Sequence, residues 1–232
     1  MREIFRQELE QVGDDLVLMA RHVQTAMEHA SIALATGDLR LAERVIDDDR
    51  TVDQLEQSLD EQCVTLLARQ QPVATDLRVV VSALRLSATL ERMGDLARHV
   101  AQVARGRYPE LAVPESFTDV FRRIADASNT VARDVVRLLE GRDLALAATI
   151  EADDDQLDAL HRETFRLMLA PRENARPLDA QQVVDVTLLG RYYERFGDHG
   201  VSVARRIAYL VTGEAYGTTI PDGVDAQISR GA

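Results

Sequence analysis

Two pentapeptides, ERMGD at residues 91–95 and ERFGD at residues 194–198, each place a Glu and an Asp four residues apart. Two further acidic pairs, Asp49 with Asp53 and Asp154 with Asp158, have the same spacing. Four residues are about one helical turn, so on a helix the two carboxylates of a pair lie on one face. Like charges placed this way destabilise a helix by about 0.2–0.5 kcal/mol per pair. The spacing therefore predicts a ligand or partner that compensates for the repulsion.

Carboxylates that converge from facing helices can hold a cation. Mg, Mn, Fe and Zn all accept oxygen ligands, with water completing the shell. His99, four residues after Asp95, and His161, three residues after Asp158, are weaker candidate ligands. His199 follows Asp198 directly and points about 100° away from it on a helix. The competing interpretation is a solvated face, since the chain has 39 Asp and Glu residues and single ExxxD pairs occur by chance.

The composition excludes several classes of chemistry. All 27 basic residues of the 232-residue chain are Arg, so a P-loop lysine or a Schiff-base lysine is excluded. Cys63 is the single cysteine, which excludes an intrachain disulfide and predicts a reducing, cytoplasmic compartment. A net charge of −12 argues against nucleic acid and anionic lipid as partners. No apolar run has the length of a membrane span, so we expect a soluble protein without membrane insertion.

Apolar residues recur at steps of three and four along most of the chain, which predicts long helices. The first is expected to end at Gly37, and Asp38 is expected to cap a second helix that ends before Pro72. Thr75 or Asp76 is expected to cap a third, which ends near residue 106. After the proline-containing segment 106–116, a fourth helix is expected from about 117 to 140. Asp143 is expected to cap a fifth helix, and a sixth is expected from about 179 to 212.

The two halves of this pattern match residue by residue, which indicates an internal duplication. Residues 48–55 (DDRTVDQL) align with 153–160 (DDDQLDAL) at a shift of 105, and the third and sixth helices align at a shift of 103. The length difference falls in a loop. We therefore predict an all-α fold of two tandem three-helix bundles, with repeats at 1–107 and 115–213. The tail 214–232 lacks an apolar period and is expected to be flexible.

With these features the chain resembles the PhoU family. The resemblance rests on the duplicated three-helix unit, the DxxxD of the second helix, the QP…DLR entry to the third and the following ERxGD, and it covers about residues 5–213. It implies an all-helical protein that binds multinuclear transition-metal clusters, with Fe foremost. The ligands carried over by position are Asp49, Asp53, Glu91, Asp95, Asp154, Asp158, Glu194 and Asp198.

The resemblance also implies partners. They are the ATPase of the phosphate ABC transporter and the membrane sensor histidine kinase of the phosphate two-component system, which would bring the protein to the inner face of the membrane. The family represses the phosphate-starvation response. Its motif commonly continues ERxGDHAxNIAE, whereas here His99 and Ser202 replace the Asn, and Gln102 and Arg205 replace the last Glu. These changes leave metal identity and number open, and a homodimer also stays open.

The leading interpretation is a non-enzymatic, metal-binding adaptor that negatively regulates phosphate uptake and signalling. One alternative is a ferritin-like di-iron oxidase, although the chain has no ExxH motif repeated at the right places. A helical scaffold without metal is a second alternative. An accessory protein of a single-component phosphate permease is a third.

Overall fold

The structure is a computed structural model that describes residues 2–170 and 177–214. Within these ranges all regular structure is helical, as the sequence predicted. The long helices are α1 (Arg2–Thr36), α2 (Leu39–Gln70), α3 (Ala74–Arg107), α4 (Thr118–Gly141), α5 (Leu144–Leu169) and α6 (Ala180–Thr212). A short 3-10 helix, η1 (Glu115–Phe117), precedes α4. The rest of the predicted tail, residues 215–232, lies outside the described residues.

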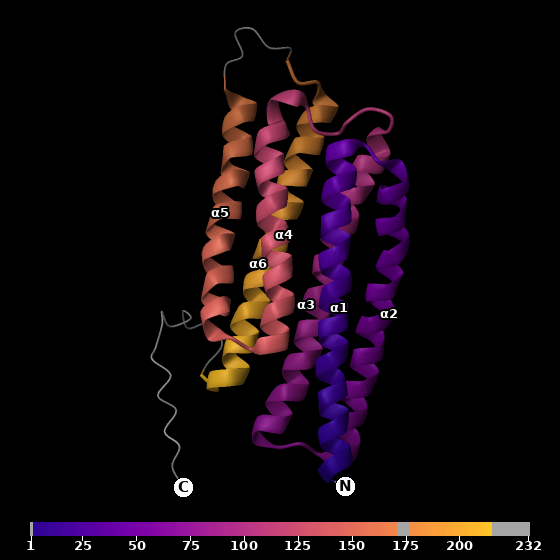
Figure 1. The fold of residues 1–232 in the computed structure, drawn as a ribbon, viewed down its shortest axis with the longest axis vertical. Helices are drawn as coiled ribbons and strands as arrows, with labels where there is room; N and C mark the ends of the chain where they lie inside the picture. Colours follow the sequence, from indigo (N-terminus) through magenta and orange to yellow (C-terminus); the bar gives the residue numbers. More distant parts are fainter. Residues whose placement is uncertain (1, 171–176, 215–232) are drawn as a thin grey trace.

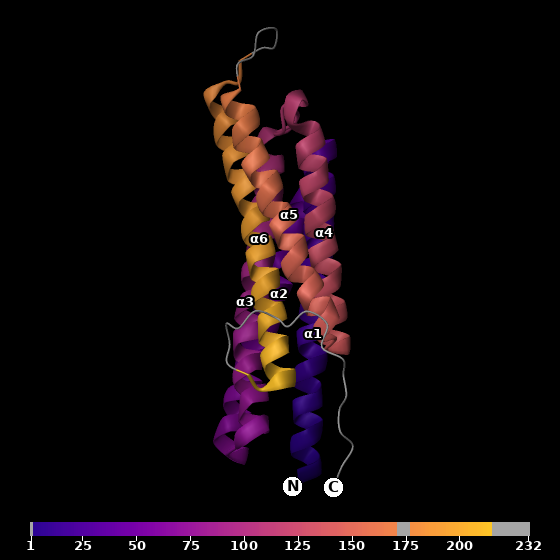
Figure 2. The ribbon, with the colours of Figure 1, turned by 90° about the vertical axis from the view of Figure 1, so that its left-hand side faces the viewer.

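The six helices run up and down along the long axis of an elongated molecule (Figure 1). Helices α1, α2 and α3 pack on one another as one bundle, and α4, α5 and α6 form the second. Contacts between α1 and α4 and between α3 and α6 join the bundles. Figure 2 shows that the second bundle is shifted along the long axis relative to the first. The predicted tandem arrangement is therefore confirmed, while the repeat boundaries stay a prediction.

Two of the three predicted helix caps are confirmed. Asp38 accepts a hydrogen bond from the Leu41 amide at 3.0 Å, and Asp143 accepts one from the Ala145 amide at 2.9 Å. Asp179 forms a reciprocal capping box with Gln182 before α6. These bonds satisfy amides that a helix start otherwise leaves without partners.

The predicted cap of α3 was wrong. The helix begins at Ala74, with Val73 at the cap position and no side-chain bond to the first amides. Thr75 instead accepts a hydrogen bond from Arg78 Nη2 at 3.3 Å. Because the helix starts closer to Pro72 than the cap pattern predicted, Asp76 lies within the first turn, where a negative charge favours the helix dipole.

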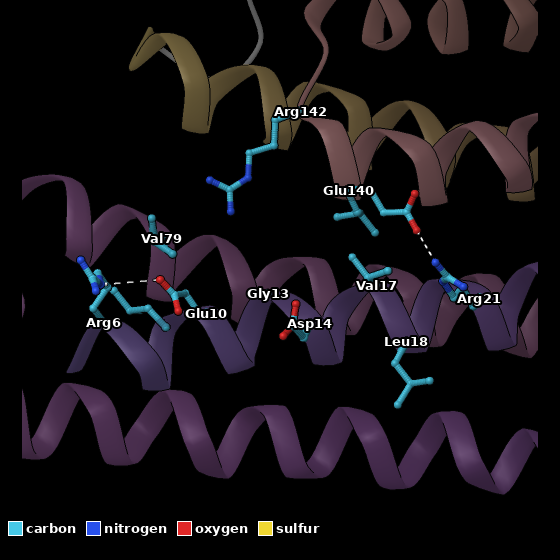
Figure 3. A pocket seen from close by; sticks show the side chains of 12 residues that line it. Arg6, Glu10, Gly13, Asp14, Val17, Leu18, Arg21, Val79, Glu140 and Arg142 are labelled. Atoms are coloured by element: carbon cyan, nitrogen blue, oxygen red, sulfur yellow. Dashed lines mark hydrogen bonds and ion pairs between the residues drawn. The ribbon is translucent and has the colours of Figure 1, made fainter. Parts of the chain in front are cut away.

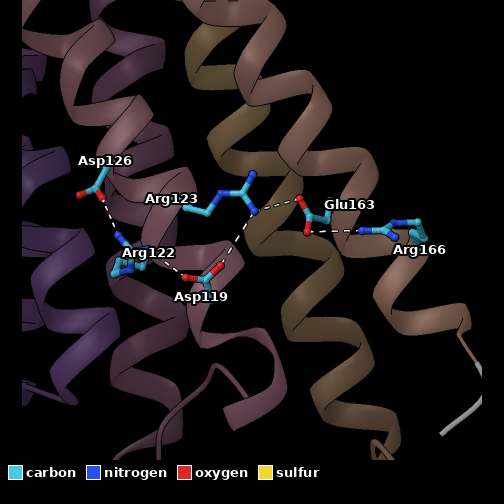
Figure 4. A network of polar contacts seen from close by, with 6 residues as sticks. All are labelled: Asp119, Arg122, Arg123, Asp126, Glu163 and Arg166. Carbon is cyan, nitrogen blue, oxygen red and sulfur yellow. Dashed lines mark hydrogen bonds and ion pairs between the residues drawn. The ribbon is translucent and has the colours of Figure 1, made fainter.

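The cores contain mainly aliphatic side chains and methionine. Met19, Met27 and Met93 are fully buried in the first bundle, and Phe117 and Phe196 in the second. Charged side chains add contacts outside the core. Figure 4 shows one such network in the second bundle, which joins α4 to α5 through Arg123 Nη1 and Glu163 Oε2 at 3.1 Å. Pairs this exposed add little to stability, so burial of the apolar stripes holds the bundles together.

Candidate functional site

In both repeats the predicted acids lie on two packed helices. Helices α2 and α3 hold the first set, and α5 and α6 hold the second. Burial raises the pKa of Asp49, Glu91, Asp154 and Glu194, and the charges of neighbouring acids of the same set add to each shift. The structure therefore brings together the predicted acids of each repeat. Asp53 and Asp198 are the exposed members of their sets.

The glycine of each ERxGD segment allows the two helices to approach. A Cβ on Gly197 would lie 2.2 Å from Asp154 Oδ1 and 2.8 Å from a methyl group of Leu157. A Cβ on Gly94 would meet Val52 at 3.2 Å and Asp49 Oδ1 at 3.5 Å. The Glu and Asp of the pentapeptide thus flank a residue without a side chain, and the facing helix places its first Asp against that gap.

The second acidic set contains carboxylate oxygens without partners. Asp154 Oδ1 and Glu194 Oε2 are buried and accept no hydrogen bond. Burial raises the pKa of Asp154 to about 7, and the charges of Asp198, Asp158 and Glu194 add to the shift. Arg191 pairs with the other oxygen of Glu194. Arg162 Nη1 lies 3.4 Å from Asp158 Oδ2, but among the described residues no arginine pairs with Asp154.

The first acidic set has its own cation. The Arg98 guanidinium lies between α2 and α3, with Nη1 3.1 Å from Asp49 Oδ2 and Nη2 paired with Asp95 Oδ1. Arg92 Nη1 lies 3.2 Å from the second oxygen of Asp95. The pKa of Asp49 is still raised to about 6, because burial outweighs the nearby guanidinium. Arg92 Nε also lies 3.5 Å from Glu91 Oε2, so three of the four predicted ligands are already paired inside the protein.

The duplication shows one residue that contributes to this difference. The counterpart of Arg98, at the shift of 103, is Val201, a buried aliphatic residue. Arg205, one turn further along α6, pairs instead with Glu151 of α5. The sequence contained this signal, because ERMGDLAR and ERFGDHGV differ at that position, but the motif alone did not show that Arg98 reaches the acids of the other helix.

The histidines lie near the acids with different surroundings. His161 Nε2 is buried without a partner, and the ring of His161 packs against Gly190 of α6. His99 Nδ1 is also unpartnered, and its ring lies 5.1 Å from that of Tyr192 across the α3–α6 contact. Burial lowers the pKa of His99, His161 and His199 alike. At pH 7 a neutral imidazole nitrogen is thus available beside each set.

Glu56 was missed in the sequence. It stands at the position of His161 in the first repeat, and burial together with Asp60 and Asp53 raises its pKa. The pattern on the second helix of each repeat is therefore DxxxDxxE in one copy and DxxxDxxH in the other. The shift of 105 that aligned the DxxxD pairs also aligns these two residues.

The donor set of the second repeat fits a cation, because it combines two orphan carboxylate oxygens and an orphan imidazole nitrogen around α5 and α6. Within the described ranges, no three Asp, Glu, His or Cys side chains already form a ligand cage. Side-chain rotations are therefore needed before the donors can share one ion. The first repeat fits less well, because Arg98 occupies the position between Asp49 and Asp95.

A cavity of about 780 Å³ lies elsewhere, between α1 and the end of α4. Figure 3 shows Glu140 of α4 and Arg142, which directly follows α4, facing Arg6, Glu10 and Asp14 of α1 across it. Glu140 pairs with Arg21 at 2.5 Å. The lining includes none of the predicted acids, and its mixture of both charges favours no single class of ligand.

Comparisons with known proteins agree with this architecture. The family model described as "PhoU domain" matches residues 16–104 and 121–207, one match in each repeat. PhoU homolog 1 of Mycobacterium leprae, a phosphate-specific transport system accessory protein, is 40% identical over 92% of this chain and 95% of its own. PhoU homolog 2 of Mycobacterium tuberculosis is 40% identical over 92% of this chain and 99% of its own.

Solved structures show the same fold. The crystal structure of PhoU from Pseudomonas aeruginosa superposes with a TM-score of 0.81 at 31% identity, covering 90% of this chain and all of that one. The phosphate transport system regulatory protein PhoU from Streptococcus pneumoniae gives a TM-score of 0.77 at 26% identity, covering 90% of this chain and 98% of that one.

Proposed function

Because the chain belongs to the PhoU family, we propose that it is an accessory and regulatory protein of phosphate transport that lowers phosphate uptake and the phosphate-starvation response when phosphate is plentiful. The observation that supports this proposal most strongly is the match of both repeats to the family, over 92% of the chain for the mycobacterial accessory proteins. This match to accessory proteins supports an accessory role rather than catalysis.

Metal binding belongs to the proposal. In the second repeat Asp154, Asp158, Glu194 and Asp198 would hold a cation, with His161 as a further donor. The orphan oxygens of Asp154 and Glu194 support this assignment. Fe, Mn, Zn or Mg would neutralise the carboxylates and link α5 to α6. Asp49, Asp53, Glu91 and Asp95 remain the predicted ligands of a first site, in competition with Arg98.

The proposed partners are the ATPase of the phosphate ABC transporter and the membrane sensor histidine kinase. Within the described residues no helix is long and apolar enough to cross a membrane. We therefore propose that the protein reaches the membrane through these partners. An accessory role beside a single-component permease is a variant of the same function, and the identity of the captured transporter distinguishes the two.

The test combines gene deletion with partner capture. Deletion should raise expression of phosphate-starvation genes at high phosphate, and a chain carrying an affinity tag should co-purify the ATPase or the kinase from detergent-treated membranes. Complementation with the Asp154→Asn variant then shows whether the second acidic set matters for regulation. Unchanged expression in a strain with no other member of the family, together with no captured transporter or kinase, would refute the proposal.

The same purified protein tests the oxidase alternative. Elemental analysis after purification without chelator should find transition metal, and dioxygen consumption with the iron-loaded protein should stay at the level of free iron. Turnover of dioxygen would instead favour an enzyme.

A further inference from the structure

The side chain of His161 lies at the contact between α5 and α6, beside the second acidic set. It follows Asp158 by three residues, so the imidazole and the carboxylate project from one face of α5. The Nε2 atom of His161 is buried and has no hydrogen-bond partner. A buried polar atom without a partner costs free energy unless something binds it. The unpartnered nitrogen therefore points to a ligand at this place.

The backbone of α6 faces this nitrogen at Gly190. A Cβ on Gly190 would lie 3.1 Å from His161 Cδ2, 3.7 Å from His161 Nε2 and 3.4 Å from Thr164 Oγ1. Gly190 precedes Glu194 by one helical turn, and Glu194 Oε2 is a second buried atom without a partner. The unpartnered nitrogen of α5 and the unpartnered oxygen of α6 therefore come from neighbouring turns of one helix contact.

The charged groups near the ring show which donors could join the nitrogen. Burial is the largest cause of the lowered pKa of His161, with weaker effects from the charges of Arg191, Asp158 and Arg162. Burial also raises the pKa of Glu194, and the charge of Asp158 adds to that shift. Asp158 is therefore near both His161 and Glu194. Together these three residues offer one nitrogen and two carboxylate groups, a mixed donor set of the kind that holds a transition metal.

The duplication shows that the two repeats differ here at two facing positions. The counterpart of His161 at the shift of 105 is Glu56, and the counterpart of Gly190 at the shift of 103 is Ser87. Ser87 is fully buried, and its hydroxyl donates to the carbonyl oxygen of Leu84 at 2.9 Å. The second repeat thus has an imidazole on one helix and no side chain on the other, where the first has a carboxylate and a serine. Because Gly190 leaves room for the ring, the two differences fit each other.

We propose that His161 sets the class of metal that the second acidic set binds, with Nε2 as a nitrogen ligand that favours Zn, Fe and Ni over Mg, Ca and Mn. Imidazole suits the first group of ions, whereas carboxylate and water suit the second. The first repeat has an oxygen donor, Glu56, at the same position. This inference rests on the proposed metal site of the second repeat and adds which ions that site selects.

Titration calorimetry tests the proposal on the full chain, which is freed of metal with chelator, dialysed and titrated separately with Zn and with Mn. His161→Glu installs the residue of the first repeat. It should weaken Zn binding by at least about tenfold, since losing even an outer-shell partner of a ligand costs about that much. Mn binding should be unchanged or tighter, because a carboxylate replaces the imidazole.

The change in the ratio of the Zn and Mn dissociation constants is the deciding quantity, because most sites already prefer Zn to Mn. His22→Gln, on α1 and outside the acidic sets, is the matched control and should keep the wild-type ratio. Gly190→Ser installs the other residue of the first repeat and should displace the ring, so that Zn binding weakens and Mn binding stays. If a single variant does not fold, the double variant His161→Glu/Gly190→Ser gives the same comparison.

Nuclear magnetic resonance detects the nitrogen ligand directly. In wild-type protein labelled with nitrogen-15 in histidine, the Nε2 resonance of His161 is the one that the His161→Glu spectrum lacks. Zn should shift this resonance and leave that of His22 in place.

Asp158→Asn distinguishes this inference from the proposed metal site. An unchanged Zn-to-Mn ratio in His161→Glu, or an Nε2 resonance that Zn does not move, overturns the inference, and the metal site still stands if Asp158→Asn abolishes binding. A wild-type protein that binds neither Zn nor Mn overturns both.

Discussion

The two acidic sets differ in the positive charge that reaches their buried Asp. In the first repeat Arg98 pairs with Asp49 and Asp95, while in the second its counterpart is Val201, and the buried oxygens Asp154 Oδ1 and Glu194 Oε2 have no partner. A buried carboxylate without a partner is costly, and either a guanidinium or a metal ion can relieve that cost. Both repeats therefore gather carboxylates that repel one another. Arg98 reduces this repulsion in the first repeat, and the proposed cation would do so in the second.

Exchanging these residues should exchange the behaviour of the sites. Arg98→Val should lower the unfolding free energy of the metal-free protein by about 2–4 kcal/mol, because it removes the guanidinium that pairs with the buried Asp49. It should also add metal-dependent stabilisation to the first repeat. Val201→Arg should remove metal binding from the second repeat. Urea unfolding with chelator and with added Mn or Fe measures both effects, and equal metal-induced shifts in wild type and both variants would contradict the assignment.

The raised pKa of Asp154 predicts how stability depends on pH. The folded state holds this proton more tightly than the unfolded chain, so the metal-free protein should lose stability as pH rises from about 4 to about 7. Asp154→Asn should flatten part of that slope and stabilise the metal-free protein by about 1–2 kcal/mol at pH 8. Urea midpoints in chelator at about pH 5 and pH 8 measure this.

The neighbouring Asp155→Asn is the matched control for that experiment, because Asp155 is exposed and is the smallest contributor to the shift. It should keep nearly all of the wild-type slope. A slope that is the same in Asp154→Asn and in wild type would show that this carboxylate titrates normally. Burial would then be a smaller influence than the geometry implies.

At the scale of the helices, Gly94 and Gly197 allow two helices of each repeat to approach closely. This approach places Asp49 against α3 and Asp154 against α6. The approach is tighter in the second repeat, where a Cβ on Gly197 would meet Asp154 Oδ1 at 2.2 Å, than in the first, where a Cβ on Gly94 meets nothing nearer than 3.2 Å. The helix pairs of the two repeats therefore share a sequence motif but differ in how much space they leave for a side chain at its glycine.

Alanine substitutions should reveal that difference. Gly197→Ala should destabilise the protein by about 1–3 kcal/mol and displace Asp154, so that metal binding is lost. Gly94→Ala should be close to neutral, because the gain of about 1 kcal/mol in helix propensity offsets a mild contact. Gly13→Ala in α1, where a Cβ meets nothing within 4 Å, should stabilise by about 0.5–1 kcal/mol. Thermal unfolding of the three variants checks this order, and a Gly197→Ala protein as stable as wild type would contradict it.

Much of the fold could be predicted, because its main signals can be read directly in the sequence. These signals are the apolar period, the caps Asp38 and Asp143, and the internal duplication. The α3 start could not, since Asp76 has the residue type of a cap and only the path of the chain after Pro72 puts it inside the helix. The acidic residues were found by spacing. Arg98 was not, because its contact with Asp49 joins residues 49 positions apart on different helices, and sequence spacing on one helix says nothing about that contact.

At the scale of the whole molecule, α3 and α6 run antiparallel and join the two bundles (Figure 1). Polar contacts support this joint at separate points. Ser31 Oγ and Tyr193 OH lie 3.0 Å apart in the buried region between α1 and α6, and Arg107 pairs with Asp185 near the start of α6. The interface therefore depends on a few buried polar pairs within an apolar contact.

These pairs should differ in their contribution to stability. Asp185→Ser should lower the unfolding free energy by about 3–5 kcal/mol, because a charged partner is removed from a buried pair. Tyr193→Phe should cost about 1 kcal/mol, the net value of a neutral hydrogen bond. Urea unfolding of both variants, with Tyr193→Phe/Ser31→Ala as the double variant, measures the contributions. A smaller loss for Asp185→Ser than for Tyr193→Phe would show that the ion pair does not support the joint.

A guanidinium carried on the chain cannot dissociate, so Arg98 keeps the first acidic set supplied with positive charge at a constant effective concentration. If the second set binds an ion as proposed, its occupancy would instead follow the free concentration of that ion. A titration of the intact chain with metal should therefore trace a single hyperbola, with one step and no cooperativity between repeats. Duplication would then have produced one site that senses ion supply and one that is indifferent to it.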